Sequence, residues 1–506
     1  MLYGLVILTL WFTGSCRKKF QYEPARGRFR TNVDTLFLDS VFTHTSSPTY
    51  SFKIYNTSHE NISIPFVGLE NGSSSFYRLN VDGMAGRTFR NVEIPAGDSI
   101  FVFVEVTADI SRLPDPVYEE NLIIGGDGAE KKVLLTAFVK DALFLYPERY
   151  NRHQTDSITV ATDGNGNPIR VSGFLLDSDT TITDAKAVVI YGHLGIPRGV
   201  TLHISEGAHL YFHYNSGIVV YEGGRLDIEG SHTRPVILED DRMQPEYEKA
   251  PGMWNFIWFQ QGSSGNRIRH TIIKNTLAGI IAHPADSLAV PVVELENTRI
   301  YNAQAFGIFA AASYVTGDNV VINNCGSSAL RIHLGGRYRF RHCTFANYGP
   351  GIRGPEDAAV YISNYYDTYD NTGRPVRLVN DLEDCLIANS IIYGNRNTEW
   401  MVARDDNAAC AYFVQNSLIR FDDPMNQIQE DFTDFANPQH YADILLNGRP
   451  DFHIPEENDL HIGMQSDAIG LADPAVAASV PLDLDGNDRT AHPDAGAYQH
   501  RDFDDN

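Results

Sequence analysis

Alternating apolar and polar positions mark the first quarter of the chain. Stretches such as "YSFKIYN" (50–56) and "SIFVFVEVTAD" (99–109) alternate or run apolar, and they are rich in β-branched and aromatic residues. Turn-rich phrases such as "VDGMAG" (81–86) and "IPAGDS" (94–99) separate these stretches. Short strands at this spacing are typical of a β-sandwich, so we expect an immunoglobulin-like (Ig-like) β-sandwich over residues 31–140.

After a turn-rich connector at 141–168, the pattern changes to very short strands divided by glycines. In "TLHISEGAHLYFHYNSGIVVYEGGRLDIEG" (201–230) the apolar residues keep a period of two within each strand. The period of 3.6 residues that marks a helix is missing from this stretch. The sequence therefore predicts an all-β protein.

A five-residue phrase ending in asparagine recurs farther along the chain. It reads "TIIKN" (271–275), "TRIYN" (298–302), "VVINN" (320–324), "CTFAN" (343–347) and "CLIAN" (385–389). Its last residues are Asn275, Asn302, Asn324, Asn347 and Asn389, with separations of 27, 22, 23 and 42 residues. Such a period favours a repeat fold in which coils stack on one another. We expect a parallel β-helix (solenoid) over 169–421, with C-terminal coils and a cap over 422–506.

The phrase also sets a register that the surrounding residues can test. The residues two positions before each asparagine are all apolar and include Ile300, Ile322 and Phe345, so we expect one inner file. Positions six and eight before it are nearly all charged: Arg267, Arg269, Glu294, Glu296, Asp318, Arg339, Arg341, Asp381 and Glu383. These columns predict a surface charge ladder, and the asparagines predict an amide ladder. The 42-residue interval is one coil with a long side loop, or two coils.

The N-terminus begins with the apolar stretch "MLYGLVILTLWFTGSC". Its apolar part is too short to span a bilayer and suits the core of a secretion signal. Small residues followed by Cys16 are typical of a bacterial lipoprotein, so we expect a signal peptide at 1–15, lipidation (palmitate) at Cys16 and a tether at 16–30. An ordinary signal peptide with a chance cysteine is the alternative. Arg17 after the cysteine favours the outer membrane, periplasmic or surface-facing.

The charge balance excludes one class of partner. The formal net charge of the 506-residue chain is −24, and a phosphate backbone would be repelled by such a field, so nucleic-acid binding is not expected. The surplus carboxylates are interpreted as a solvated surface. Bound Ca²⁺ or a basic partner protein is the alternative.

Aromatic residues are the candidate binding groups. The phrase "GMWNFIWFQQG" (252–262) holds Trp254 and Trp258, and the loops at 350–380 and 396–409 hold Tyr365, Tyr366 and Trp400. Exposed aromatic rings suit sugar rings or protein partners, whereas the alternative is that they pack beneath a loop. The histidines near 203–213 have no cysteine or carboxylate at metal-ligand spacing.

Two further motifs leave open interpretations. In "LDLDGNDRTAHPDAGAYQ" (482–499), Asp483, Asp485, Asn487 and Asp494 resemble a calcium loop, although its glycine is misplaced and the bidentate glutamate is absent. Calcium is therefore a possible cofactor. Cys343 and Cys385 occupy the same position in the repeated phrase, so they are expected to stack, as a disulfide or as buried free thiols.

Several stretches resemble one family. These are "NVDTLFLDSVFT", "FRNVEIPAGDSIFVFVEV", "TLHISEGAHLYFH", "PGMWNFIWFQQGS", "GGRYRFRHCTFANY" and the C-terminal "SDAIGLAD…LDLDGNDR…PDAGAYQ". Together they resemble a largely uncharacterised family of right-handed parallel β-helix lipoproteins of Bacteroidota. The resemblance covers nearly the whole chain and implies the fold and a cell-envelope location. It implies no catalytic residues.

No P-loop, Gly-x-Ser-x-Gly or zincin motif occurs in the sequence. We therefore expect a non-enzymatic binding or scaffold protein of the outer membrane, whose β-helix flank and loops bind a protein partner or a polysaccharide. One alternative is a polysaccharide lyase or glycoside hydrolase, which rests on fold analogy alone. Another is an accessory subunit of an outer-membrane secretion, assembly or uptake complex.

Overall fold

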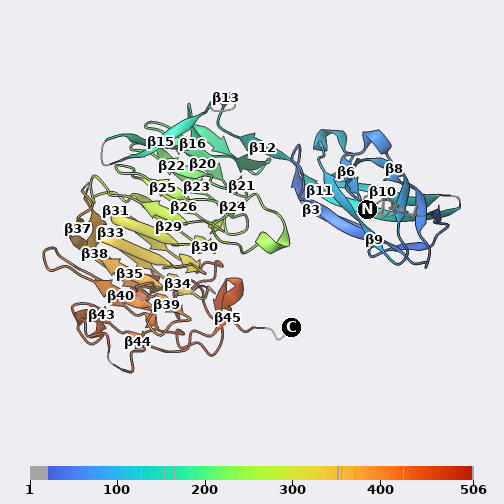
Figure 1. Cartoon of the computed structure of the whole chain (residues 1–506). Helices are drawn as coiled ribbons and strands as arrows, with labels where there is room; N and C mark the ends of the chain where they lie inside the picture. Colours follow the sequence, from blue (N-terminus) through green and yellow to red (C-terminus); the bar gives the residue numbers. More distant parts are fainter. Residues whose placement is uncertain are drawn as a thin grey trace, which may run out of the picture. The chain divides into compact units, whose positions relative to one another are not determined.

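The computed structural model describes residues 21–503, apart from positions 127, 152–153, 164–165, 350, 352, 355, 371 and 426. The predicted lipidation site Cys16 lies outside these residues. The chain is all-β and divides between Asp141 and Ala142 into two compact units (Figure 1). In the described part of the chain, the one α-helix is the single turn α1 (Pro474–Ala477), and no helix is long and apolar enough to cross a membrane.

The N-terminal unit consists of two sheets. The five-stranded sheet has the order β2 (Phe29–Thr31), β4 (Tyr50–Asn56), β9 (Ser99–Val106), β6 (Tyr77–Val81), β7 (Met84–Gly86). The six-stranded sheet has the order β1 (Glu23–Pro24), β5 (Ile62–Leu69), β10 (Val117–Gly126), β11 (Ala129–Lys140), β3 (Thr35–Phe42), and β8 (Thr88–Ile94) also pairs with β5. Alternate residues of both sheets share one core; in β9, for example, Val102 and Val104 are fully buried between outward-facing Phe101 and Phe103.

In the second unit, successive repeats each add one strand to an eleven-stranded sheet, all of whose pairings are parallel (Figure 1). Its strands are β12 (Ala142–Leu145), β18 (Ala187–Ile190), β21 (His209–Phe212), β24 (Val236–Asp240), β27 (Thr271–Lys274), β30 (Arg299–Tyr301), β32 (Val321–Asn323), β34 (Thr344–Asn347), β39 (Ile391–Gly394), β42 (Leu418–Ile419) and β44 (Leu445–Leu446). Parallel neighbours require the chain to cross over between them.

The chain that crosses between these strands forms an eighteen-stranded sheet, whose strands lie in two rows. The two rows join at β31 (Ile308–Asp318) and β33 (Leu330–Arg341), because each of these long strands runs through both rows. One row holds β15 (Ser157–Thr162), β16 (Pro168–Leu175), β19 (His193–Ile196), β22 (Gly217–Val220), β25 (Ile257–Phe259), β28 (Ile280–Ala282), β35 (Val360–Ser363) and β40 (Trp400–Ala403). The other holds β17 (Thr180–Ile182), β20 (Thr201–Ser205), β23 (Arg225–Glu229), β26 (Asn266–Arg269), β29 (Val293–Glu296), β38 (Leu382–Ala388), β41 (Phe413–Gln415) and β43 (Tyr441–Ala442). We call these the first row and the second row.

The predicted inner file is confirmed. Ile300 pairs with Ile322, and Ile322 pairs with Phe345, so the three residues lie in one column across β30, β32 and β34. All three are fully buried in the core of the second unit. Burial of each such side chain contributes about 1.5–3 kcal/mol to the free energy of unfolding. The repeats keep this register because a shift of one residue would expose these side chains.

The register predicted for Asn389 is wrong. In the structure, Ile387 pairs with Phe340 and Ile391 pairs with Thr344, so "CLIAN" lies in the second row rather than beside "CTFAN". The long interval is one repeat with insertions, including the hairpin β36 (Tyr365–Tyr369) and β37 (Pro375–Val379). The interpretation as one coil with a long side loop is therefore correct, but the phrase itself is displaced.

The charge ladder forms across the repeats whose register is correct. Arg269 and Glu296 are 3.1 Å apart, Arg341 and Asp318 are 2.6 Å apart, and Arg267 and Glu294 are 3.4 Å apart, each joining neighbouring strands. Asp381 and Glu383 do not continue these columns, because Arg339 pairs with Leu386 and Arg341 with Ala388. The two exposed pairs, Arg267–Glu294 and Arg269–Glu296, each stabilise the fold by at most about 1 kcal/mol, which fits a structural role.

The C-terminal segment folds back over the outer face of the eleven-stranded sheet. Leu460, Leu484 and Tyr498 pack against Val321 and Ala346, which face outward from β32 and β34. The segment carries the short hairpin β45 (Phe452–Ile454) and β46 (Asp459–Ile462). Within the predicted C-terminal domain, β43 and β44 still add strands to the eighteen-stranded and eleven-stranded sheets, and the chain after them covers the side of the eleven-stranded sheet.

Candidate functional site

Only part of the predicted asparagine ladder forms. Asn302 donates to Asn275 at 3.0 Å, and Asn275 donates to Asp240 at 2.9 Å. Asn302 and Asn324 do not bond to each other directly but through Asn458 of the C-terminal segment. Asn458 donates to Asn302 at 3.1 Å and accepts from Asn324 at 2.8 Å. Asn347 binds main-chain atoms of Cys325 and Ser327, and Asn389 belongs to the other column described next.

A second ladder was missed by the sequence prediction. Its members all have positive φ and end strands of the second row: His270, Asn297, Asn319, His342, Asn389 and Asn416. Asn319 donates to Asn297 at 2.8 Å, and the fully buried Arg489 donates to Asn319 at 2.9 Å. The sequence does carry a signal for this second ladder. An asparagine or histidine lies five residues before each of Asn275, Asn302, Asn324 and Asn347. Both ladders hold turns and the C-terminal segment, and so they are structural.

Two of the predicted binding residues lie in the core. Trp254 is fully buried, stacks on Phe212 with ring centroids 4.1 Å apart, and donates from Nε1 to the Lys274 carbonyl. Trp400 is also fully buried and donates to the Tyr441 hydroxyl at 2.9 Å. Neither ring can reach a ligand, so the prediction that they bind one is wrong. Both instead fill volume inside the stacked repeats.

Trp258 faces outward and belongs to the first of two groups of aromatic contacts that follow one another along the first row. We call the two groups together the aromatic belt, and its members are Phe256, Trp258, His283, Phe306, Phe309, His333, Tyr361 and Tyr366. Neighbouring ring centroids within the linked groups lie 5.1–5.7 Å apart. Ile281 joins the two halves, because it pairs with Trp258 on one side and Phe309 on the other.

The belt follows from the alternation of short strands. Ile257 and Phe259 point inward and are fully buried, so Trp258 between them points outward; Ile308 and Ala310 place Phe309 in the same way. Arg331 and Tyr361 continue the column in β33 and β35. Most belt rings are half-buried, Tyr361 is nearly covered, and Tyr366 is 43% exposed.

The belt carries little charge. Burial, reinforced by the neighbouring Arg331, lowers the pKa of His333 to about 4, so its ring is neutral at pH 7. Burial also lowers the pKa of His283. Arg331 is the belt's cation; it stacks over Tyr361 at 4.2 Å and pairs with Asp357 at 3.2 Å.

The hairpin β36–β37 brings the remaining two predicted residues to the end of the belt. Tyr366 meets His333 edge to face at 5.3 Å, and the Arg377 guanidinium lies 3.9 Å over the Tyr365 ring. Beside the hairpin is a cleft of about 650 Å³, whose lining includes Asp286, Asp381 and Glu383. Two of these carboxylates are engaged, since Glu383 pairs with Arg337 at 3.0 Å and Asp381 accepts from the Ala409 amide.

The structure does not support calcium at the C-terminal motif. Asp483 accepts from the main-chain amides of Asp485, Asn487 and Gln499, and Asp494 accepts from those of Gly470 and His500. Asp485 binds His461 at 2.7 Å. Because these oxygens already hold a turn together, they do not converge on a cation. Across the described residues, no group of three or more His, Cys, Asp or Glu side chains is arranged to hold a metal ion.

Cys343 and Cys385 do not stack. Cys385 pairs with Tyr338, in keeping with the corrected register, and Cys325, Cys343, Cys385 and Cys410 are all free thiols. Burial raises the pKa of the Cys343 and Cys385 thiols, so both stay protonated. The expected stacking is therefore wrong under both interpretations, although the two thiols are free and buried as one of them held.

Comparison with known proteins does not assign this chain to a family. No protein-family model matches the chain, and no curated protein matches it. Among solved structures, a PapD-like domain of human CEP192 (PapD-like domain 7) is similar over 24% of this chain and 92% of that chain, with 8% sequence identity and a TM-score of 0.16. A TM-score this low does not bear on the fold.

Proposed function

We propose that this protein is a non-enzymatic binding protein of the bacterial cell envelope that holds a glycan along its aromatic belt. In this proposal the second unit is a right-handed parallel β-helix, the first unit is an Ig-like β-sandwich, and a lipid on Cys16 tethers both to the outer membrane. The long parallel ladders and the two-sheet core support these finer assignments.

One observation carries the binding proposal. Trp258, Ile281, Phe309, Arg331 and Tyr361 are successive cross-strand partners on the outer face of the first row. Adjacent strands lie about 4.8 Å apart, so the rings of Trp258, Phe309 and Tyr361 recur at every second strand of the column. Trp258 and Phe309 are half-buried, whereas Tyr361 is covered by Arg331. Flat rings with a neutral surface suit the apolar faces of sugar rings, and a line of them suits an extended chain of sugars.

The soluble chain (residues 21–506) tests this proposal by titration calorimetry against cellohexaose and mannohexaose. Phe309→Ala removes one ring from the middle of the belt, and we expect at least a tenfold loss of affinity for whichever oligosaccharide binds. Phe309→Tyr should keep the affinity because it keeps the ring. Tyr214→Ala is the matched control, since Tyr214 is 62% exposed outside the belt. Absence of binding, or equal binding by folded Phe309→Ala, contradicts the proposal.

The cleft beside the hairpin favours one second candidate, a glycoside hydrolase. Hydrolysis of a glycosidic bond uses two carboxyl groups, and Asp286, Asp381 and Glu383 line this cleft next to the belt. Overnight incubation with the same oligosaccharides, followed by product analysis, separates the candidates. Shorter products that disappear in Asp286→Asn would establish the hydrolase and reject the non-enzymatic proposal.

A further inference from the structure

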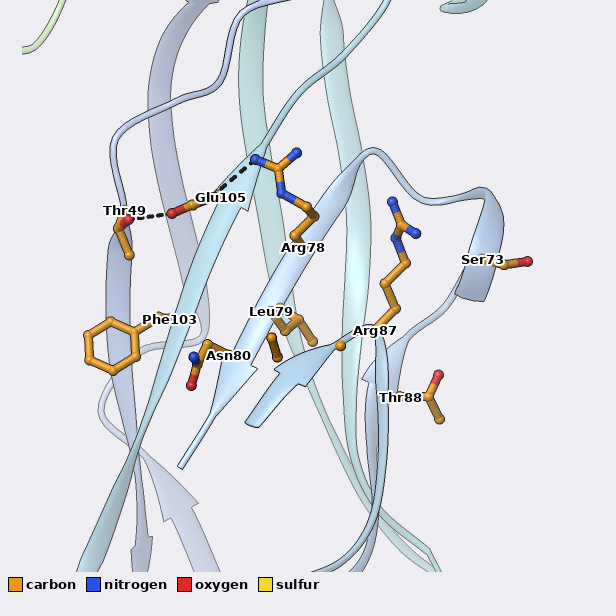
Figure 2. Close-up of a pocket in the computed structure, with 11 residues that line it drawn as sticks. Thr49, Ser73, Arg78, Leu79, Asn80, Arg87, Thr88, Phe103 and Glu105 are labelled. Atoms are coloured by element: carbon orange, nitrogen blue, oxygen red, sulfur yellow. Dashed lines mark hydrogen bonds and ion pairs between the residues drawn. The ribbon is translucent and has the colours of Figure 1, made fainter. Parts of the chain in front are cut away.

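A hollow of about 730 Å³ lies on the N-terminal unit, and none of its lining residues belongs to the aromatic belt or to the cleft beside the hairpin (Figure 2). It spans the outer side of β9, β6 and β7 and the start of β8. Its polar and aromatic lining comprises Thr49, Ser73, Arg78, Asn80, Arg87, Thr88, Phe103 and Glu105. Figure 2 shows the Arg78 and Arg87 side chains beside each other at this hollow.

A tight hairpin creates the hollow. Asp82 and Gly83 both have positive φ, and Val81 pairs with Met84, so only two residues connect β6 and β7. The resulting edge strand β7 is three residues long. Arg87 follows it immediately and leads into β8 of the other sheet, which places a guanidinium where the two sheets meet.

The two arginines of the hollow differ in their partners. Arg78 is held by Glu105 at 3.1 Å, Ser46 at 2.8 Å and Thr107 at 2.8 Å. Arg87 donates from Nε to the Tyr77 carbonyl at 3.2 Å, and among the described residues it takes part in no ion pair. A guanidinium fixed through Nε still presents its two terminal nitrogens, which match the two oxygens of a carboxylate.

An aromatic surface continues from the hollow. Phe103 is 37% exposed and stacks with Phe101, which is 44% exposed, with ring centroids 5.6 Å apart. Lys53 lies 4.4 Å over the Phe101 ring. Exposed rings of this size on a monomer commonly mark a contact surface.

The charge of this sheet face opposes that of the chain. The five strands of the sheet carry Arg30, Lys53 and Arg78 but only one acid, Glu105. Arg87 adds a fourth cation beside them. In a chain of net charge −24, such a basic face attracts anions that the remaining surface repels.

We propose that the hollow binds a carboxylate-bearing sugar of an acidic glycan. The Arg87 terminal nitrogens would take the carboxylate in a two-point contact, the sugar ring would lie against Phe103, and Asn80 and Thr88 would meet its hydroxyls. This site is separate from the aromatic belt, and it adds selectivity for negative charge that the belt lacks.

A sugar fits this hollow better than an acidic peptide does. Peptides that bind a sheet edge need a row of unpaired main-chain groups, and the three-residue strand β7 offers too short a row. The hollow instead surrounds one exposed ring with side-chain hydroxyl, amide and guanidinium groups. That combination recognises a ring bearing many hydroxyls and one charge.

The test is calorimetry on the soluble chain with tetragalacturonate and with the neutral galactotetraose. We expect only the acidic oligosaccharide to bind at this site, and its affinity to fall with added salt, because salt screens exposed charges. Arg87→Gln should weaken binding at least tenfold. Arg87→Lys should recover only part of the loss, since an ammonium lacks the planar fork.

Arg90→Gln is the matched control, because Arg90 is an exposed arginine of β8 that does not line the hollow. Arg90→Gln should bind tetragalacturonate as tightly as the parent does. Phe309→Ala should also bind it as the parent does, so this experiment can succeed even if the proposal for the aromatic belt fails. The proposal is overturned if tetragalacturonate does not bind, if galactotetraose binds equally, or if Arg87→Gln binds as the parent does. Binding of a Glu-Glu-Phe peptide that depends on Arg87, without binding of the oligosaccharide, also overturns it.

Discussion

Asn389 Nδ2 lies 2.9 Å from Nε2 of His342, a residue 47 positions earlier in the chain. An amide NH₂ can only donate, so Nε2 accepts and the imidazole is neutral. Burial, together with the charge of Arg489, lowers the pKa of His342 to about 2 and agrees with this state. Asn389 also accepts from the Asp473 amide and donates to its carbonyl, so a single side chain joins two repeats and the C-terminal segment.

Asn389→Ala should therefore destabilise the protein by about 2–4 kcal/mol, since it removes buried hydrogen bonds and forces alanine to adopt positive φ. Urea denaturation followed by circular dichroism measures the loss. Asn215→Ala is the control, because Asn215 also has positive φ but is exposed in a turn. Equal losses for both variants would mean that backbone strain alone accounts for the effect.

Arg353 and Glu399 form a buried ion pair with contacts of 2.6 and 2.8 Å, and their side chains are 2% and 0% exposed. Removing one partner leaves a buried charge unpaired, so Arg353→Met should cost about 3–5 kcal/mol in denaturation experiments. Arg353→Met with Glu399→Leu should recover much of that loss.

The exposed pair of Arg28 and Glu60 provides the comparison, because Arg28→Met should cost at most about 1 kcal/mol. A double variant of Arg353 and Glu399 that is no more stable than the single variant would contradict the explanation by an unpaired charge.

Acid should loosen the C-terminal segment. Burial favours the protonated Asp459, but hydrogen bonds from His453 and His461 outweigh it and lower the pKa to about 2. The unfolded chain has the higher pKa and binds the proton first. The stability contributed by Asp459 is thus present above pH 4 and is lost as the pH falls toward 2.

Thermal melts in steps between pH 5 and pH 2 should show this loss, and Asp459→Asn should flatten it. Asp406→Asn, at a carboxylate that is 90% exposed, should leave the pH profile unchanged. A parent profile that is flat over this window would refute the role of Asp459.

Lipidation is predicted for the full chain expressed in a bacterium with its N-terminal stretch. Labelled palmitate should be incorporated, and Cys16→Ser should abolish the label and move the protein out of the membrane fraction. Cys410→Ser should leave both unchanged. Label retained by Cys16→Ser would place the acylation elsewhere.

The inner file could be predicted because burial acts on every repeat at once. Ile300, Ile322 and Phe345 share one environment, so composition at that position is constrained in each copy of the phrase. Asn389 could not be placed for a related reason. Strands of the second row and of the eleven-stranded sheet both end at residues of positive φ, such as Asn297 and Asn302, so similar phrases arise twice in a repeat.

The outward or inward direction of the tryptophans also could not be predicted. Counting by twos puts Trp254 and Trp258 on one face, but the strand begins only at Ile257 and the chain bends before it. Trp254 therefore points into the core while Trp258 points out. The hollow at Arg87 left no periodic signal, because β6, β7, β8, β9 and the adjoining turns each contribute only a few residues to it.

The way the first row is built sets how its surface can vary. Most strands of that row bond only to the repeat before and the repeat after, so a whole repeat could be lost or duplicated without disturbing distant ones. The row of rings would then shorten or lengthen by a fixed step of about 4.8 Å. The length of the aromatic belt is thus set by the number of repeats in the first row.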